Sequence, residues 1–370
     1  MWSPFVKIRD MYFRYERLIS SVSLVGGFVF DAFTLRRVDL FWDNVWVVVH
    51  FIIIATCIVA INFLENKRIT QKQEVVLRMR TPTLHFWFVT ILQFFFGGLL
   101  STFLVFYFRS GTLAVTWPFL LLLGGAFAAN EALKQHYTRL VFQISLFFLA
   151  LFSFAIFIVP IIVHQIGPAI FVLSGVVSIV VLWLFLVVLR FVARETFQQS
   201  KKVLAVSVGG IFVITNILYF TNVIPPLPLS LQGGGVYHSL VHTSAGYVVT
   251  TEPHGWFDFF SPYQVFHEVP GQPIYAWTAV FSPAALNTTI VHVWQQYVAA
   301  THEWVTRAQV PLTIIGGRAG GYNTYSMLGT IAPGAWRVNA ETTNGQVIGR
   351  LLFRVVATTT EPTLETEIKN

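Results

Sequence analysis

The chain has 370 residues, of which 55% are hydrophobic and only 11% are charged. This is more apolar surface than one soluble core of this size can bury, so a lipid bilayer is the expected solvent for much of the chain. The net charge of +7 is uneven: 18 Lys and Arg stand against 9 Asp and Glu before residue 224, and 6 against 8 after it. The basic residues lie in short segments between apolar runs and form no continuous stripe, which argues against a nucleic-acid partner.

Seven apolar segments are predicted to span the membrane, each close to the roughly 20 residues that a helix needs to cross the hydrocarbon core. They are residues 18–35, 45–63, 85–108, 112–130, 139–163, 169–189 and 203–223. The first is the weakest, because it is short, rich in Ser and Gly, and contains Asp31. A re-entrant or interfacial helix is its alternative. Several charged residues precede any sustained apolar run, so an uncleaved signal-anchor is expected.

Basic residues flank alternate segments, which predicts the orientation of the chain. With the amino terminus inside, fifteen Lys and Arg fall in cytoplasmic segments and three on the opposite side. By the positive-inside rule, the amino terminus is cytoplasmic and residue 224 onward lies outside. The predicted location is the bacterial inner (cytoplasmic) membrane, with a periplasmic carboxyl-terminal domain.

The predicted spans carry few ionisable groups, which usually mark ion or substrate pathways in membranes. Gly pairs such as Gly97-Gly98 and Gly124-Gly125 are expected to permit close helix packing. Neutral polar residues are expected to form interhelical hydrogen bonds: Asn62, Gln93, Gln143 and Asn216. Neither a pair of membrane aspartates nor a Gly-x-Ser-Gly nucleophile with a later membrane histidine occurs, so hydrolysis within the bilayer is not expected.

The composition changes at residue 224, and four parts are predicted. They are a multispanning helical membrane domain (1–223), a Pro/Gly connector (224–235), a β-sandwich-like periplasmic domain (236–358) and a polar tail (359–370). Adjacent prolines favour an extended conformation that stops the helix, and Gly233-Gly234-Gly235 suggests a sharp turn.

Strand signals recur beyond the connector at about ten-residue spacing, as in an all-β sandwich. The predicted strands are residues 247–251, 274–281, 289–297, 303–308, 311–315, 322–327, 335–342 and 347–356. Thr343-Asn344-Gly345 predicts a hairpin with a type I′ turn, since Asn and Gly tolerate positive φ. The predicted fold class is an all-α membrane bundle of about seven transmembrane helices followed by an all-β, sandwich-like extracytoplasmic domain.

Several short elements of the carboxyl-terminal part resemble the bacterial domain of unknown function 2914. They are Tyr237-His238, residues 292–295, 315–318, Gly321-Tyr322, 333–338 and 345–350. The similarity covers roughly residues 225–356, and this family commonly joins such a domain to a multispanning amino-terminal half. The resemblance therefore implies the two-part architecture and no particular activity. A basic residue often follows the Gly-Tyr pair where this chain has Asn323, which leaves a charge-dependent role of that loop open.

Two groups of residues are candidate contacts for a ligand or partner. Arg318, Arg337 and Arg350 are predicted on neighbouring strands, where they could bind a carboxylate or lipid phosphate bidentately. The alternative for Arg318 is a hairpin or wide loop in which it reaches an acidic partner. An apolar loop is predicted to contact the membrane, the helical half or a partner protein, and its candidate residues are Trp256, Phe257, Phe259 and Phe260.

Six of the ten histidines lie after residue 224, and zinc would need three or four of them to converge. No close metal-binding signature occurs, because His302-Glu303 lacks a second histidine four residues on. The only cysteine, Cys57, lies in an apolar run, so neither an intrachain disulfide nor a thiolate-rich metal site is available. No metal, cofactor or catalytic residue is predicted.

These patterns favour a non-enzymatic envelope protein whose external domain binds a protein partner, or assembles as a homo-oligomer or as a subunit of a larger membrane complex. The alternatives are an enzyme or carrier acting on an envelope lipid or glycan, and a receptor that signals through a separate partner. The lipid bilayer is an expected partner in every case.

Overall fold

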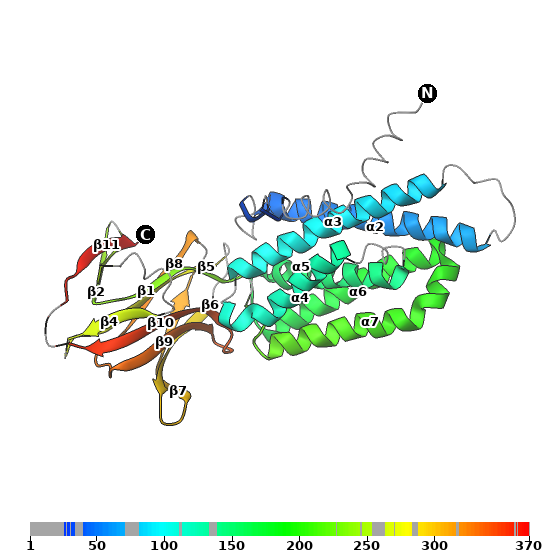
Figure 1. Cartoon of the computed structure of the whole chain (residues 1–370). Helices are drawn as coiled ribbons and strands as arrows, with labels where there is room; N and C mark the ends of the chain where they lie inside the picture. The colour runs from blue at the N-terminus through cyan, green and yellow to red at the C-terminus, as the bar shows by residue number, and fades with distance from the viewer. Residues whose placement is uncertain are drawn as a thin grey trace. The chain divides into compact units, whose positions relative to one another are not determined.

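The computed structural model shows apolar helices in the amino-terminal part and a β-rich carboxyl-terminal part (Figure 1). The residues it describes are 26, 28–29, 31–33, 40–70, 81–110, 113–132, 139–226, 228–244, 246–253, 263–269, 271–282, 288–315, 318–358, 360 and 362–369. The chain forms two compact units, one of helices and the other made mainly of Asn222–Asn370.

The helices are α2 (Phe41–Thr70), α3 (Thr81–Ser110), α4 (Leu113–Ala132), α5 (Leu140–Val163), α6 (Pro168–Val192) and α7 (Arg194–Phe220). Five contain stretches long and apolar enough to cross a membrane: Phe41–Asn66, Trp87–Phe108, Leu140–Val163, Pro168–Val192 and Arg194–Phe220. The apolar stretch within α4, Thr116–Ala129, is shorter. The first predicted span, residues 18–35, lies mostly outside the described residues.

Polar side chains join some of the helices. The amide nitrogen of Asn62 on α2 donates to Gln143 Oε1 on α5 at 2.6 Å, and both residues are buried. This confirms the interhelical hydrogen bond predicted for these two residues. Asn216 differs, because its amide nitrogen donates to the Phe212 carbonyl of its own helix at 2.8 Å, which satisfies that donor locally.

Glycine permits a close approach at one of the predicted pairs. A Cβ on Gly98 of α3 would lie 3.1 Å from His50 Nε2 of α2, so glycine makes room for that ring. At Gly124 and Gly125, a Cβ would meet nothing within 4 Å in the described part of the chain. The prediction of close packing therefore holds at Gly98, and at the second pair it stays a prediction.

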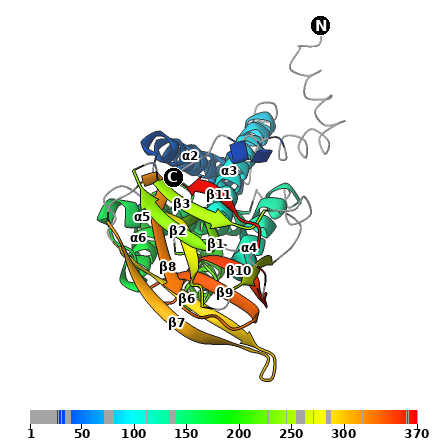
Figure 2. The ribbon, with the colours of Figure 1, turned by 90° about the vertical axis from the view of Figure 1, so that its left-hand side faces the viewer.

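The described residues of the β-rich unit form three sheets, whose strands can be followed in Figures 1 and 2. The first sheet has the order β1-β5-β8, the second β4-β10-β9-β6-β7 and the third β11-β3-β2. The only parallel pair in the described residues is β4 with β10. The strands are β1 (Ser230–Tyr237), β2 (Ser239–Thr243), β3 (Gly246–Thr251), β4 (Gln264–Glu268), β5 (Ile274–Ser282), β6 (Thr288–Val298), β7 (Glu303–Ile314), β8 (Arg318–Leu328), β9 (Gly334–Thr342), β10 (Val347–Ala357) and β11 (Glu365–Lys369).

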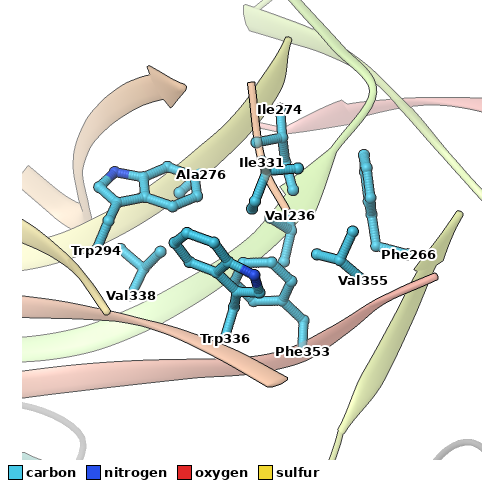
Figure 3. Packing of buried hydrophobic residues seen from close by; sticks show 10 residues of the cluster. All are labelled: Val236, Phe266, Ile274, Ala276, Trp294, Ile331, Trp336, Val338, Phe353 and Val355. Atoms are coloured by element: carbon cyan, nitrogen blue, oxygen red, sulfur yellow. The ribbon is translucent and has the colours of Figure 1, made fainter. Parts of the chain in front are cut away.

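The first sheet shares a hydrophobic core with each of the other two. Figure 3 shows one such core, in which Val236, Ile274 and Ala276 of the first sheet pack with residues of the second sheet such as Trp294 and Phe353. On the other face of the first sheet, Tyr237, Trp277 and Ala279 pack with Leu240 and Val249 of the third sheet. Because β5 is covered on both faces, nearly all of its residues are buried, as in strands with no solvent face.

The structure corrects the predicted strand list. The segments 303–308 and 311–315 form one long strand, β7, and Pro311 fits within it because β7 is an edge strand. Four strands were not predicted: β1, β2, β4 and β11. Part of the predicted connector therefore belongs to the first sheet, and part of the predicted polar tail pairs with β3 as β11.

The glycines of the predicted connector form part of a strand instead of a sharp turn. Gly233, Gly234 and Gly235 pair with β5. A Cβ on Gly234 would lie 2.8 Å from Leu351 Cδ2, and one on Gly235 would lie 2.6 Å from Tyr237 Oη. A Cβ at either position would force a neighbouring side chain to move, which favours glycine in this strand.

The predicted hairpin joins β9 to β10, but its turn is of another type. The Gly345 N–H donates to the Thr342 carbonyl at 2.9 Å, and Gly345 has φ +79° while Asn344 does not have positive φ. This is the geometry of a type I turn followed by a left-handed glycine, which forms a bulge. The type I′ assignment is therefore wrong, although the hairpin itself is confirmed.

A buried polar network links the first and second sheets. His292 on β6 is fully buried; its Nε2 lies 2.8 Å from Thr278 Oγ1 and its Nδ1 lies 2.9 Å from Ser326 Oγ. The Trp294 indole N–H donates to the same Ser326 oxygen at 2.9 Å. These partners make the polar atoms acceptable inside an apolar core.

Candidate functional site

The structure brings together two of the predicted ligand contacts. Arg337 lies on β9 and Arg350 on β10, which are adjacent antiparallel strands of the second sheet. Arg318 begins β8 of the first sheet, where its backbone pairs with Ser282, so the prediction that it lies on a strand neighbouring the other two is wrong. Its side chain lies outside what the structure describes, as do the candidate residues of the apolar loop, Trp256, Phe257, Phe259 and Phe260.

Strand alternation places both arginines on one face of the second sheet. Trp336 and Val338 point into the core, so Arg337 and Asn339 point the opposite way. Similarly, Phe353 belongs to the core, and Arg350 lies three positions earlier on the opposite side. We call this side, which points away from the core shared with the first sheet, the outer face of the second sheet.

Amide side chains hold the two guanidinium groups in place. Arg337 Nε donates to Gln295 Oε1 at 2.6 Å, and Arg350 Nε donates to Asn339 Oδ1 at 2.7 Å. The amide of Gln295 in turn donates to Thr306 Oγ1 at 3.1 Å, and that of Asn339 donates to Glu341 Oε1 at 2.9 Å. The network runs across β7, β6, β9 and β10, and it fixes the plane of each guanidinium through its Nε atom.

The cluster carries an excess of positive charge. Burial, and then the neighbouring Arg350, lowers the pKa of Arg337 to about 10, so both arginines remain cations at neutral pH. Burial raises the pKa of Glu341, while the Asn339 hydrogen bond and the two arginines oppose this change. Within the described residues, no ion pair or hydrogen bond engages the terminal nitrogens of either guanidinium. Their planar N–H forks are therefore free to bind an anion.

Aromatic rings flank the cluster at one end. The Arg337 guanidinium lies over the Trp304 ring, 4.4 Å from its centroid, and the Tyr297 ring lies 5.4 Å from that of Trp304. Both rings are partly exposed. Three members of this site were not predicted from the sequence: Gln295, Asn339 and Trp304. The alternation of β6 and β9 was the available signal, but it does not reveal which strands are neighbours.

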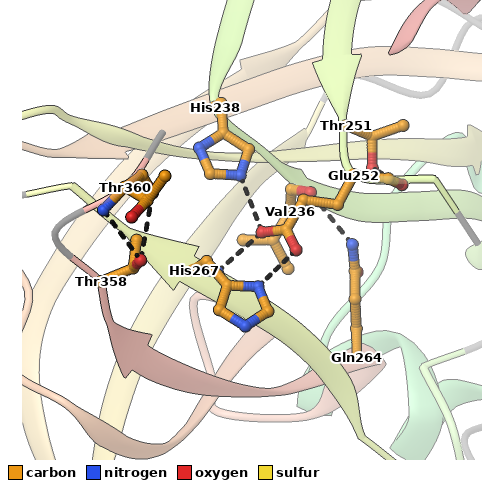
Figure 4. Close-up of polar contacts among 8 residues, drawn as sticks. All are labelled: Val236, His238, Thr251, Glu252, Gln264, His267, Thr358 and Thr360. Atoms are coloured by element: carbon orange, nitrogen blue, oxygen red, sulfur yellow. Dashed lines mark hydrogen bonds and ion pairs between the residues drawn. The ribbon is translucent and has the colours of Figure 1, made fainter. Parts of the chain in front are cut away.

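A second polar cluster surrounds the Glu252 carboxylate (Figure 4). One oxygen lies 3.0 Å from His238 Nε2 and accepts the His267 backbone N–H at 2.7 Å, and the other lies 2.6 Å from His267 Nδ1. Burial tends to raise the pKa of Glu252, but the hydrogen bonds from His267 and His238 outweigh it, so the pKa is lowered. The cluster ties the third sheet to β4, and in the described part of the chain no three side chains have a metal-binding arrangement.

The apolar helices and the β-rich part together define a membrane protein with a folded carboxyl-terminal domain. Residues 287–355 match the family described as Protein of unknown function (DUF2914), which confirms the resemblance over a shorter stretch than residues 225–356. The match runs from just before β6 to near the end of β10, and includes Arg337 and Arg350.

No curated protein matches this sequence significantly. Among solved structures, one match is the Pseudomonas fluorescens alkylpurine DNA glycosylase AlkC bound to DNA containing an abasic site analog, at 12% identity. It covers 83% of this chain and 96% of that chain with a TM-score of 0.21, which does not indicate a shared fold.

Proposed function

We propose that this chain is a non-enzymatic protein of the bacterial inner membrane, whose periplasmic domain binds an anionic group on a partner in the envelope. The proposal includes a cytoplasmic amino terminus, seven spans and a sandwich-like arrangement of the first and second sheets. The asymmetry of basic residues between alternate loops supports the orientation.

The arginine pair on the outer face of the second sheet carries this proposal. Two guanidinium groups face one carboxylate, and amide oxygens hold both through Nε while leaving the N–H forks free among the described residues. A site whose donors are already oriented loses little conformational freedom when it binds. Paired guanidinium forks match the geometry of carboxylate and phosphate groups.

A charge-matched pair of variants tests the proposal. The full chain is placed in nanodiscs of neutral phosphatidylcholine, and its binding to polyglutamate and to polyphosphate is measured by biolayer interferometry. The Arg337→Gln/Arg350→Gln variant is expected to lose affinity by at least tenfold, because each charge-assisted hydrogen bond is worth about 1.5–3 kcal/mol. The control, Arg307→Gln/Arg354→Gln, removes two exposed arginines from the same sheet and is expected to bind within about threefold of the natural protein.

Equal loss in both variants would show diffuse electrostatic attraction and contradict the proposal. Unchanged binding in the Arg337→Gln/Arg350→Gln variant would contradict it as well. Thermal unfolding followed by tryptophan fluorescence verifies that each variant is folded.

A further inference from the structure

We infer that the outer face of the second sheet recognises an acidic saccharide, meaning a sugar chain that bears carboxylates such as those of uronic acids. This inference rests on the proposed function and names the chemical class of its ligand. It depends on three properties of the face: its charge beside aromatic rings, the side-chain origin of the polar groups at the arginines, and its small amount of exposed apolar surface.

The first property is complementary charge beside an apolar ring. The Arg337 guanidinium touches Trp304, and Tyr297 lies next to Trp304, so the anion-binding forks and two partly exposed aromatic rings are neighbours. A ligand seated here must present an acid group and an adjacent face of C–H groups. A sugar ring that carries a carboxylate has both within one residue, and its C–H face can pack on an aromatic ring.

The second property disfavours an extended acidic peptide. Peptide strands are recognised chiefly through backbone hydrogen bonds at a sheet edge. Gln295 and Arg337 lie on β6 and β9, which both have neighbours on either side within the second sheet, so their backbone groups are used in the ladder. Around the arginines, on β6, β9 and β10, the face therefore offers only side chains, which suit the carboxylates and hydroxyls of a saccharide.

The third property disfavours a lipid. Binding of a lipid beyond its headgroup requires exposed apolar surface for the acyl chains. On β6, β7 and β9 no large hydrophobic side chain is classed as exposed, and Val293, at the centre of the face, is buried. The exposed ones on this face are Val265 on β4 and Val356 on β10, and Val356 lies six residues along its strand from Arg350. An anionic headgroup would thus find the arginines but little apolar surface beside them for its tails.

The experiment compares ligands of equal charge and different skeleton. The full chain in phosphatidylcholine nanodiscs is titrated with an α-1,4-linked galacturonate oligomer, with polyglutamate of the same number of carboxylates, and with a neutral galactose oligomer. Galacturonate is expected to bind about tenfold more tightly than polyglutamate, and the neutral oligomer at least tenfold more weakly than galacturonate.

Variants at Tyr297 separate ring contact from charge, because Tyr297 is not the ring beneath Arg337. Tyr297→Leu is expected to reduce galacturonate affinity by about tenfold and to leave polyglutamate affinity unchanged, while Tyr297→Phe retains both. Equal binding of galacturonate and polyglutamate, with neither sensitive to Tyr297→Leu, would overturn the saccharide assignment and leave the anion site intact. If neither anion depends on Arg337 and Arg350, the proposed function itself fails.

Discussion

His292 is held neutral inside the β-rich domain, and this makes stability depend on pH. Burial lowers the pKa of His292 to about 4, against an ordinary value of 6.5. Between these values, the unfolded chain takes up a proton that the folded chain does not, so the free energy of unfolding falls as the pH decreases through this window. Across this whole window the free energy of unfolding falls by roughly 3 kcal/mol, because each pH unit of pKa difference corresponds to about 1.36 kcal/mol. The measurement is the thermal unfolding midpoint of the full chain between pH 7 and pH 4.

His292→Gln is the matched variant, because glutamine is polar and does not titrate. It is expected to lower stability at pH 7 and to flatten the pH dependence above pH 4.5. Glu252 does not affect the slope in this window. Its pKa is lowered in the folded chain, so its contribution to the free energy of unfolding is present above pH 4.5, the ordinary pKa of this carboxyl, and is lost only at lower pH. Identical slopes above pH 4.5 in the natural protein and the variant would contradict the role of His292.

Single residues of the binding site differ in how well the sequence predicts them. Arg337 and Arg350 were predicted as ligand contacts, because a charged residue within a strand of β-branched and aromatic residues is unusual and indicates a specific role. Gln295 and Asn339 did not, because neutral amides are common on solvent faces. Their role depends on the register that sets Gln295 opposite Arg337 and Asn339 opposite Arg350, and register is a property of distant segments in space.

The fit between β1 and β10 depends on glycine, and substitution tests it. A Cβ on Gly349 of β10 would lie 2.7 Å from Leu231 Cβ of β1, closer than side-chain atoms approach. Gly349→Ala is expected to destabilise the domain by about 1–3 kcal/mol through overpacking. The control is Gly329→Ala, where a Cβ meets nothing within 4 Å in the described structure and the backbone is not left-handed. It is expected to be neutral or slightly stabilising. Chemical denaturation of both variants provides the comparison, and equal stability would refute the packing argument.

Strands with alternating β-branched and aromatic residues, such as β6, β9 and β10, were predicted close to their observed bounds. β1 was not, because Pro and Gly normally signal a connector, and only its neighbours explain why glycine is needed. β11 is short and rich in charge, so its composition does not indicate a strand; it exists through backbone pairing with β3. Local composition thus predicts the strands that carry their own hydrophobic pattern, and misses those defined by a distant partner.

The orientation of the whole chain is open to a direct chemical test. Cys57 is the only cysteine, so Cys57→Ala gives a background in which single cysteines report their side of the membrane. A cysteine in the β6–β7 turn, from Ala300→Cys, is expected to react with a membrane-impermeant maleimide in intact spheroplasts. A cysteine from Lys202→Cys is expected to react only after permeabilisation. The reverse pattern would contradict the predicted orientation.

The parallel pairing of β4 with β10 constrains the order in which the domain assembles during synthesis. Gln264 pairs with Phe353, so β4 leaves the ribosome long before its partner exists. β4 cannot pair with β10 while most of the domain is still being translated, and pairings between segments so distant in sequence form slowly. The nascent domain therefore passes through a stage with unpaired strand edges and exposed apolar side chains, in which aggregation competes with folding. A chaperone that shields these edges would increase the yield of this protein more than that of a domain built from neighbouring hairpins.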